Sequence, residues 1–151
     1  MAGRSYTLVA DAVAETTAQD LMRITAPADA TVIIDKVTVT QETQTSSEAL
    51  AVQLQRSSTA GTGSAITAEQ LEEGDAAFGG TAIGTITADT TIDGAPIVRE
   101  AWNVLAPFVW HPTPEERIAV SPSGIFVVRL DVAPGASMTI TTTVAFRELG
   151  G

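Results

Sequence analysis

The feature that most constrains the fold is a strict alternation of apolar and polar residues. In residues 138–147 the even positions carry Met, Ile, Thr, Val and Phe, and the odd positions carry three Thr, Ala and Arg. The same period occurs in 125–132, with the even positions apolar, and in 50–57, where Leu50, Val52 and Leu54 form the apolar set. In 32–41 the apolar face is Ile33, Val37 and Val39. Because successive side chains of a strand point to opposite sides, each segment predicts a half-buried strand.

Asp35 interrupts the apolar face of 32–41. It either forms hydrogen bonds at a sheet edge or marks a β-bulge. Weaker strands are predicted at 6–13, 21–26, 84–88, 98–104 and 117–120. Pro- and Gly-containing turns separate many of these segments, as at 26–29, 121–124 and 133–136. About eight or nine short strands with regular turns predict an all-β sandwich or barrel.

Some connections are also predictable. Pro134-Gly135 joins the last two strong strands and predicts a hairpin. Residues 57–64 form a Ser-, Thr- and Gly-rich loop, and 76–93 form a long surface excursion. A capping-box pattern at Thr67–Gln70 allows at most a short helical turn near 67–73, with a strand as the alternative.

Composition narrows the class of protein. The 151 residues suit one domain over 1–151. The net charge of −10 argues against nucleic-acid binding, because a negative field repels phosphate backbones. There is no run of 18 apolar residues and no apolar leader at the N-terminus, so neither a membrane span nor a signal peptide is predicted. We therefore expect synthesis in a cytoplasm.

No pattern typical of an active site is visible. His111 is the only histidine and cysteine is absent, so an imidazole–thiolate metal site has no second ligand. The acidic residues lack the spacing of a calcium loop, and no nucleophile elbow is present. We expect no catalytic, cofactor or metal site and no enzymatic activity. A pair of carboxylates that meet only in the folded chain is the residual enzymatic alternative.

The aromatic residues cluster between prolines. Trp102, Phe108 and Trp110 lie within nine residues of one another. We expect Trp102 and Phe108 to close one end of the core, whereas Trp110 fits a core position and a partner contact equally well. The predicted partner-contact residues are Tyr6, Trp110, His111, Glu115 and Glu116.

Four segments resemble a group of small virion proteins of tailed bacteriophages. They are the stretch 17–29 ending in Ala26-Pro27-Ala28-Asp29, the Thr/Gly/Ser loop before Ile66, the Trp-x-Pro-x-Pro-Glu-Glu-Arg segment at 110–117, and the closing pattern at 137–149. This resemblance implies a jelly-roll sandwich that decorates and stabilises the outer capsid surface. It also implies the major capsid protein as partner and a homotrimer as the assembled form.

Two other binding roles stay open. One is a tail, head–tail or receptor-binding component of the virion, which differs from a decoration protein in its low copy number. The other is a lectin-like sandwich, for which Trp110 with Glu115 or Glu116 is the candidate carbohydrate platform.

Overall fold

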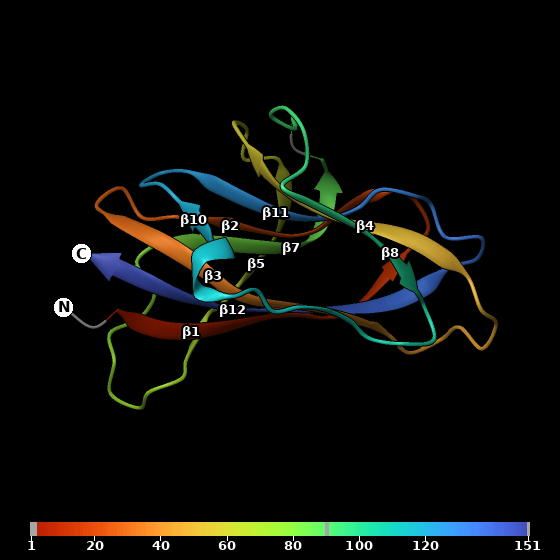
Figure 1. Ribbon diagram of the computed structural model, residues 1–151, viewed down its shortest axis with the longest axis horizontal. Helices are drawn as coiled ribbons and strands as arrows, with labels where there is room; N and C mark the ends of the chain where they lie inside the picture. The colour runs from red at the N-terminus through yellow and green to blue at the C-terminus, as the bar shows by residue number, and fades with distance from the viewer. Residues whose placement is uncertain (1–2, 90, 151) are drawn as a thin grey trace.

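The protein folds as two antiparallel β-sheets packed face to face (Figure 1). The computed structural model describes residues 3–89 and 91–150. These residues form twelve strands and one short 3-10 helix, η1 (Pro114–Glu116). The strands are β1 (Arg4–Glu15), β2 (Gln19–Thr25), β3 (Ala30–Gln41), β4 (Ala49–Ser57), β5 (Thr62–Ile66), β6 (Glu69–Gln70), β7 (Thr81–Ala88), β8 (Val98–Asn103), β9 (Phe108–Trp110), β10 (Ile118–Val120), β11 (Ile125–Leu130) and β12 (Met138–Gly150).

The first four strands alternate between the sheets. Sheet A has the order β10-β3-β12-β1-β6, and β9 also pairs with β3. Sheet B has the order β5-β7-β2-β11-β4-β8. The longest strands, β1, β3 and β12, therefore form the middle of sheet A, while β8 and β9 lie at edges. The all-β sandwich predicted from the alternation is confirmed.

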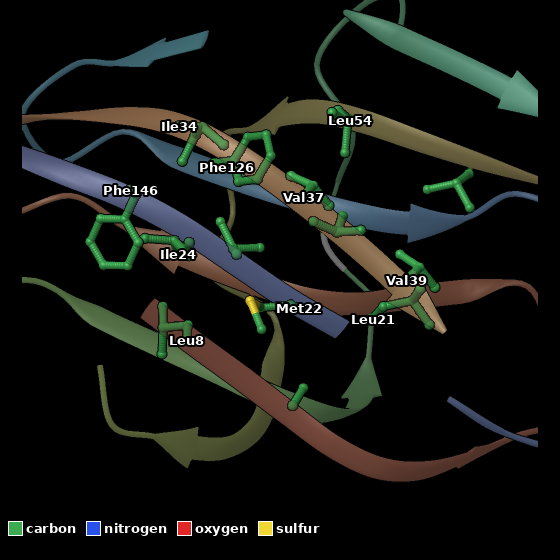
Figure 2. Packing of buried hydrophobic residues seen from close by; sticks show 14 of the residues in the cluster. Leu8, Leu21, Met22, Ile24, Ile34, Val37, Val39, Leu54, Phe126 and Phe146 are labelled. Atoms are coloured by element: carbon green, nitrogen blue, oxygen red, sulfur yellow. The ribbon is translucent and has the colours of Figure 1, made fainter. Parts of the chain in front are cut away.

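The core fills the space between the sheets (Figure 2). Leu8 from β1 and Phe146 from β12 meet Met22 and Ile24 from β2, and Phe126 from β11 closes the layer. Each of these side chains is fully buried or nearly so. Complete burial of a large apolar side chain contributes about 1.5–3 kcal/mol. Packing between the sheets is therefore the main source of stability.

The alternation predicted for residues 138–147 is confirmed. In β12 the even positions from 138 to 148 are buried and the odd positions are half-buried. In β3 the prediction was partly wrong: Val37 and Val39 are buried, but Val32 and Ile34 replace Ile33 on the inner face. The cause is a bulge at Asp35, since Ala145 pairs with Lys36 and Phe146 with Ile34. The extra residue reverses the inward parity.

Sheet B is buried on both faces over part of its area. The predicted inner residues of β4 and β11 are buried, but so are their neighbours Gln53, Gln55 and Val127. Beside these residues the buried Arg23 donates to the carbonyl oxygen of Ala60 in the loop after β4, and Ser57 Oγ donates to the carbonyl oxygen of Thr91 at 2.6 Å. Val132, expected to point inward, lies beyond β11 and is exposed.

The predicted hairpin through Pro134-Gly135 is wrong. β11 pairs with β2 and β4 in sheet B, whereas β12 pairs with β1 and β3 in sheet A. The connection therefore crosses from one sheet to the other. Glu48 holds it in place, because its Oε1 accepts a hydrogen bond of 2.7 Å from the N–H of Gly135.

The helical turn allowed near 67–73 is also wrong, and the alternative, a strand, is what forms. Glu69–Gln70 pair with Thr7 and Tyr6 of β1. The N–H of Leu71 then donates to the carbonyl oxygen of Ser5 at 2.9 Å. In a helix, the backbone N–H and C=O groups of this segment would have bonded to one another. Here they form hydrogen bonds with the open edge of β1 instead. Within 76–93, expected to be a surface excursion with a strand at 84–88, β7 extends that strand to Thr81–Ala88.

Candidate functional site

A surface depression lies between an edge of sheet A and an edge of sheet B. Its volume is about 500 Å³. One wall comes from the β8 edge of sheet B and the other from β9, the edge strand of sheet A that precedes η1. We call it the β8–β9 groove, and its lining residues are Ile97, Val98, Glu100, Val109, Trp110, His111, Pro112 and Glu116.

Both walls are strand edges. Among the described residues, β8 pairs only with β4, and β9 pairs only with β3 through the register Val37–Trp110. The other edge of each strand has backbone N–H and C=O groups that no neighbouring strand takes up. Such edges are templates for pairing with another extended chain.

Of the three clustered aromatic residues, two lie in the core and the third, Trp110, also lines the groove. Trp102 is only 2% exposed, and its Nε1 donates to the carbonyl oxygen of Ala106 at 2.6 Å. Phe108 is also buried, as expected for a core position. Trp110 is half-buried: it packs against the core and also lines the groove. Trp110 therefore combines a core contact with an accessible face in the groove, and its role as a partner contact stays a prediction.

Two exposed aliphatic side chains accompany Trp110. Ile97 is 41% exposed and Val109 is 51% exposed, and both line the groove. A depression that combines a half-buried tryptophan with exposed aliphatic residues offers apolar area to a partner. Burial of that area is the expected driving force for binding at this site.

The loop after β9 supplies the polar part of the groove. His111 is exposed and lines it. Pro114 begins η1, where the N–H of Glu116 donates to the carbonyl oxygen of Thr113 and the Thr113 hydroxyl donates to Glu116 Oε2 at 3.2 Å. These bonds hold the Glu116 carboxylate at the rim. Glu115 is exposed on the same turn but does not line the groove.

Tyr6, predicted as a contact residue, is wholly buried. Its ring stacks on Phe146 and tilts against Phe78, with centroid distances of 5.5 and 5.6 Å. Its hydroxyl donates to the carbonyl oxygen of Ala76 at 2.8 Å. Burial and the Glu148 carboxylate raise the pKa of Tyr6. The prediction was wrong because Tyr6 shares the inward parity of Leu8 in β1.

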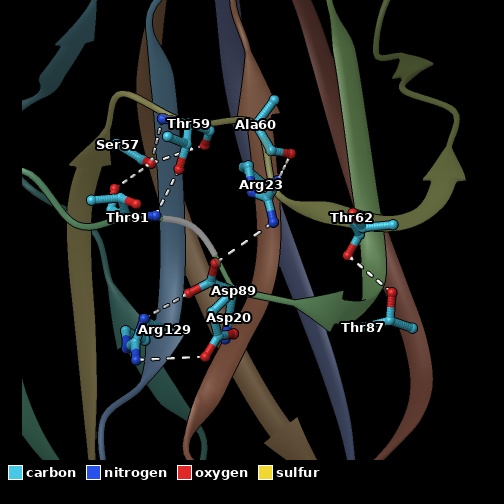
Figure 3. Close-up of polar contacts among 10 residues, drawn as sticks. All are labelled: Asp20, Arg23, Ser57, Thr59, Ala60, Thr62, Thr87, Asp89, Thr91 and Arg129. Atoms are coloured by element: carbon cyan, nitrogen blue, oxygen red, sulfur yellow. Dashed lines mark hydrogen bonds and ion pairs between the residues drawn. The ribbon is translucent and has the colours of Figure 1, made fainter.

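An ionic cluster built on the buried Asp20 and Arg23, which sequence reasoning missed, lies on the outer side of sheet B. Asp20 and Asp89 lie between Arg129 and Arg23 (Figure 3). Asp20 Oδ1 contacts Arg129 Nη1 at 3.2 Å, and its Oδ2 lies 3.6 Å from Arg23 Nη2. Arg23 also donates to the carbonyl oxygen of Ala60. The signal in the sequence was the single arginine inside the apolar run 21–24.

Glu15 adds a buried carboxyl group at the end of β1. It is 1% exposed, and its Oε2 has no hydrogen-bond partner among the described residues. Burial, with a contribution from the nearby Asp89 carboxylate, raises the pKa of Glu15 to about 7. For Arg23, burial lowers the pKa although Asp20 and Asp89 oppose the shift. The low polarity around both groups explains these opposite directions.

The arginines are mostly used within the chain. Six of the seven form ion pairs: Arg4 with Glu148, Arg23 with Asp20, Arg99 with Asp131, Arg117 and Arg147 with Asp35, and Arg129 with Asp20 and Asp89. The seventh, Arg56, donates to the carbonyl oxygen of Ala119. Within the described part of the chain, Glu100, Glu115 and Glu116 have no such ion pair. The net charge of −10 is therefore carried largely by unpaired surface carboxylates.

Residues 3–89 and 91–150 contain no group of three or more His, Cys, Asp or Glu side chains arranged to hold a metal ion. Over the same residues, no helix is long and apolar enough to cross a membrane. The arrangement at the β8–β9 groove is suited to recognition, through apolar area, strand edges and carboxylates.

Searches against protein-family models, curated proteins and solved structures find no match for this chain.

Proposed function

We propose that this chain is a structural protein of a tailed-bacteriophage virion that binds the outer capsid surface and stabilises the head. The observation that carries the proposal is the β8–β9 groove, a contact surface supported by the edges of two rigid sheets. The similarity of segments 17–29, 110–117 and 137–149 to virion decoration proteins gives the partner, the major capsid protein. No catalytic role is assigned to any residue.

The order of the strands supports a jelly-roll reading of the sandwich. If β5, β6 and β7 are treated as an insertion between β4 and β8, sheet A reads β1-β12-β3 with β9 and β10, and sheet B reads β2-β11-β4-β8. Successive strands then alternate between the sheets, except that β4 and β8 are neighbours in sheet B and that β9 and β10 both pair with β3 in sheet A. This order matches the two interleaved Greek keys of a jelly roll. The insertion adds β7 and β5 beside β2, and β6 beside β1.

A decoration protein does not need high affinity at each site. Each copy that binds only the assembled shell shifts the equilibrium toward the intact particle by mass action. A homotrimer at a symmetry axis adds avidity, because neighbouring copies then engage adjacent capsid subunits together. The sandwich is made in the host cytoplasm and acts on the outside of the finished head.

Copy number in purified virions tests this function. Quantitative protein gels should give this chain at a level comparable with the major capsid protein, and cryo-electron microscopy should place its density outside the shell. Particles from a phage that lacks the gene should release their DNA at a lower temperature, and purified protein should reverse the loss. A few copies per virion would instead identify a tail or head–tail component.

A carbohydrate-binding role is the second candidate. Trp110, Glu100, Glu116 and His111 line one groove, and an aromatic face beside hydrogen-bonding groups is suited to a sugar ring. Binding to defined oligosaccharides on a glycan array, lost in Trp110→Ala, would support this role. An array without hits would remove it.

A further inference from the structure

We propose that the β8–β9 groove binds an extended segment of a partner protein that carries alternating basic and apolar side chains. The inference rests on the proposed binding function and adds to it the chemistry and conformation of the segment that is recognised. The shape of the groove, its strand edges and the distribution of charge all favour such a segment.

The extended conformation follows from the walls. β8 offers a six-residue edge, Val98–Asn103, on the side opposite β4. A chain that pairs with this edge gains backbone hydrogen bonds, and its side chains alternate between the two faces of the new strand. One set then points toward Ile97, Val109 and Trp110, which form the apolar part of the groove.

The basic character follows from the carboxylates. Glu100 projects from β8 and Glu116 from η1 on the opposite side of the groove. Neither carboxylate forms an ion pair within the described residues, although the arginines elsewhere are almost all paired. A cation placed between the two glutamates would satisfy both, and arginine would also stack on the indole of Trp110.

A second copy of this chain is a poor occupant. Its net charge is −10, and six of its seven arginines are already held by its own acids. Two such surfaces repel each other unless an existing ion pair is broken. Nucleic acid is disfavoured for the same electrostatic reason. A basic segment of a different protein is the complementary partner.

The two tryptophans provide a direct test. In the full-length ¹⁵N-labelled protein, the indole N–H groups of Trp102 and Trp110 give separate NMR signals. A short synthetic peptide in which arginine and valine alternate should shift the Trp110 signal strongly and the Trp102 signal less, because Trp102 belongs to β8 but its indole is buried and bonded to the carbonyl oxygen of Ala106. The apparent affinity should fall as salt is raised, because exposed charges are screened. A peptide that alternates glutamate and valine should not bind.

Matched variants locate the interaction. Glu100→Gln combined with Glu116→Gln should weaken the arginine peptide about fivefold, in line with two exposed ion pairs. Glu72→Gln with Glu73→Gln makes the same charge change on the exposed loop after β6 and should leave the affinity unchanged. Val109→Ser should also weaken binding, whereas Leu105→Ser, equally exposed but outside the groove, should not. Unchanged melting temperatures would show that each variant is folded.

The proposal is overturned if the Trp110 signal does not move, if both charge variants weaken binding equally, or if the acidic peptide binds as well. An oligosaccharide that shifts Trp110 while the arginine peptide does not would also overturn it in favour of the carbohydrate role. The number of copies of each variant bound per virion tests the groove assignment separately from the proposed decoration function. If the groove variants that lose the peptide still decorate heads fully, the capsid is bound elsewhere. Peptide binding by a chain that is missing from virions would leave the groove assignment intact and refute the decoration role.

Discussion

Asp35 and Arg147 face each other across the bulge between β3 and β12, joined by hydrogen bonds of 2.9 and 3.0 Å. Arg117, just before β10, places its Nε 3.0 Å from Oδ1 of Asp35, the oxygen that also accepts from Arg147 Nη2. The hydrogen bonds with Asp35 raise the pKa of Arg147. One carboxylate at an irregular position thus ties together three neighbouring strands of sheet A.

We predict that Asp35→Ala lowers the free energy of unfolding by about 1 kcal/mol, since it breaks two partly exposed ion pairs at once. Chemical denaturation would measure the change. Asp131→Ala removes the partner of Arg99, a single and more exposed pair, and should cost about half as much. Equal losses in the two variants would contradict the role given to the bulge.

The buried Glu15 predicts an unusual dependence of stability on pH. Its pKa in the folded chain is about 7, above the ordinary value of 4.5, so folding favours the protonated form. The stabilisation is complete below about pH 4.5 and is lost as pH rises through 7. The shift corresponds to a loss of at most about 3 kcal/mol.

Glu15→Gln should flatten that profile, because the amide is neutral at every pH. Denaturation midpoints between pH 4.5 and 8 would measure the difference from the parent chain, with the exposed Glu42→Gln as the control. If the Glu15 variant and the parent chain lose stability in parallel over this range, Glu15 is not the group responsible.

The inward parity of β12 predicts a sharp contrast between neighbouring positions. Ile140 is 1% exposed, so Ile140→Asp buries an unpaired charge and should abolish folding. Thr143→Asp, on the outer face of the same strand, should fold with a change below about 1 kcal/mol. Far-ultraviolet circular dichroism and size-exclusion chromatography would distinguish the two. A soluble, folded Ile140→Asp protein would refute the strand assignment.

The close approach of Gly61 to the Arg23 guanidinium predicts that this loop contact contributes to stability. Its φ is +36°, and an added Cβ would collide with the Arg23 guanidinium and the carbonyl oxygen of Ala88. Gly74 also has a positive φ, +96°, but a Cβ there meets nothing within 4 Å. Gly74→Ala should cost about 1 kcal/mol from backbone strain alone, and Gly61→Ala about 2 kcal/mol or more. Thermal unfolding of the two variants would isolate the contact with Arg23.

Local patterns predicted the class of fold because a half-buried strand leaves a period of two in its own residues. β12 is the clearest case, with its inner and outer faces readable from Met138 to Arg147. The pattern failed where a neighbour decided the outcome. Val127 is buried between Arg23 and Gln55 of the two neighbouring strands, and the pairing of Glu69–Gln70 depends on the open edge of β1.

The candidate site could be predicted only in part, again because contacts between distant segments decide which residues belong to it. The proline-flanked segment around Trp110 signalled an unusual loop, and Trp110, His111 and Glu116 do share a groove. Glu100, Ile97 and Val109 belong to it only because β8 and β9 meet at the edges of different sheets. Tyr6 was misplaced because its position near the N-terminus hid its parity with Leu8. Asp89, whose carboxylate helps to raise the pKa of Glu15, lies too far along the chain to be placed beside it from sequence.

The start of β1 and the end of β12 lie side by side, because Arg4 of β1 lies opposite Glu148 of β12 (Figure 1). Tension applied between the ends would therefore open this strand pair from its tip, one ladder bond at a time, which is the mechanically weak direction. A force applied through β8 and β9 would not act directly on the β1–β12 pair. It would be shared by the edge strands of both sheets. Attached at its groove, the sandwich would resist an outward push far better than if it were held by its ends.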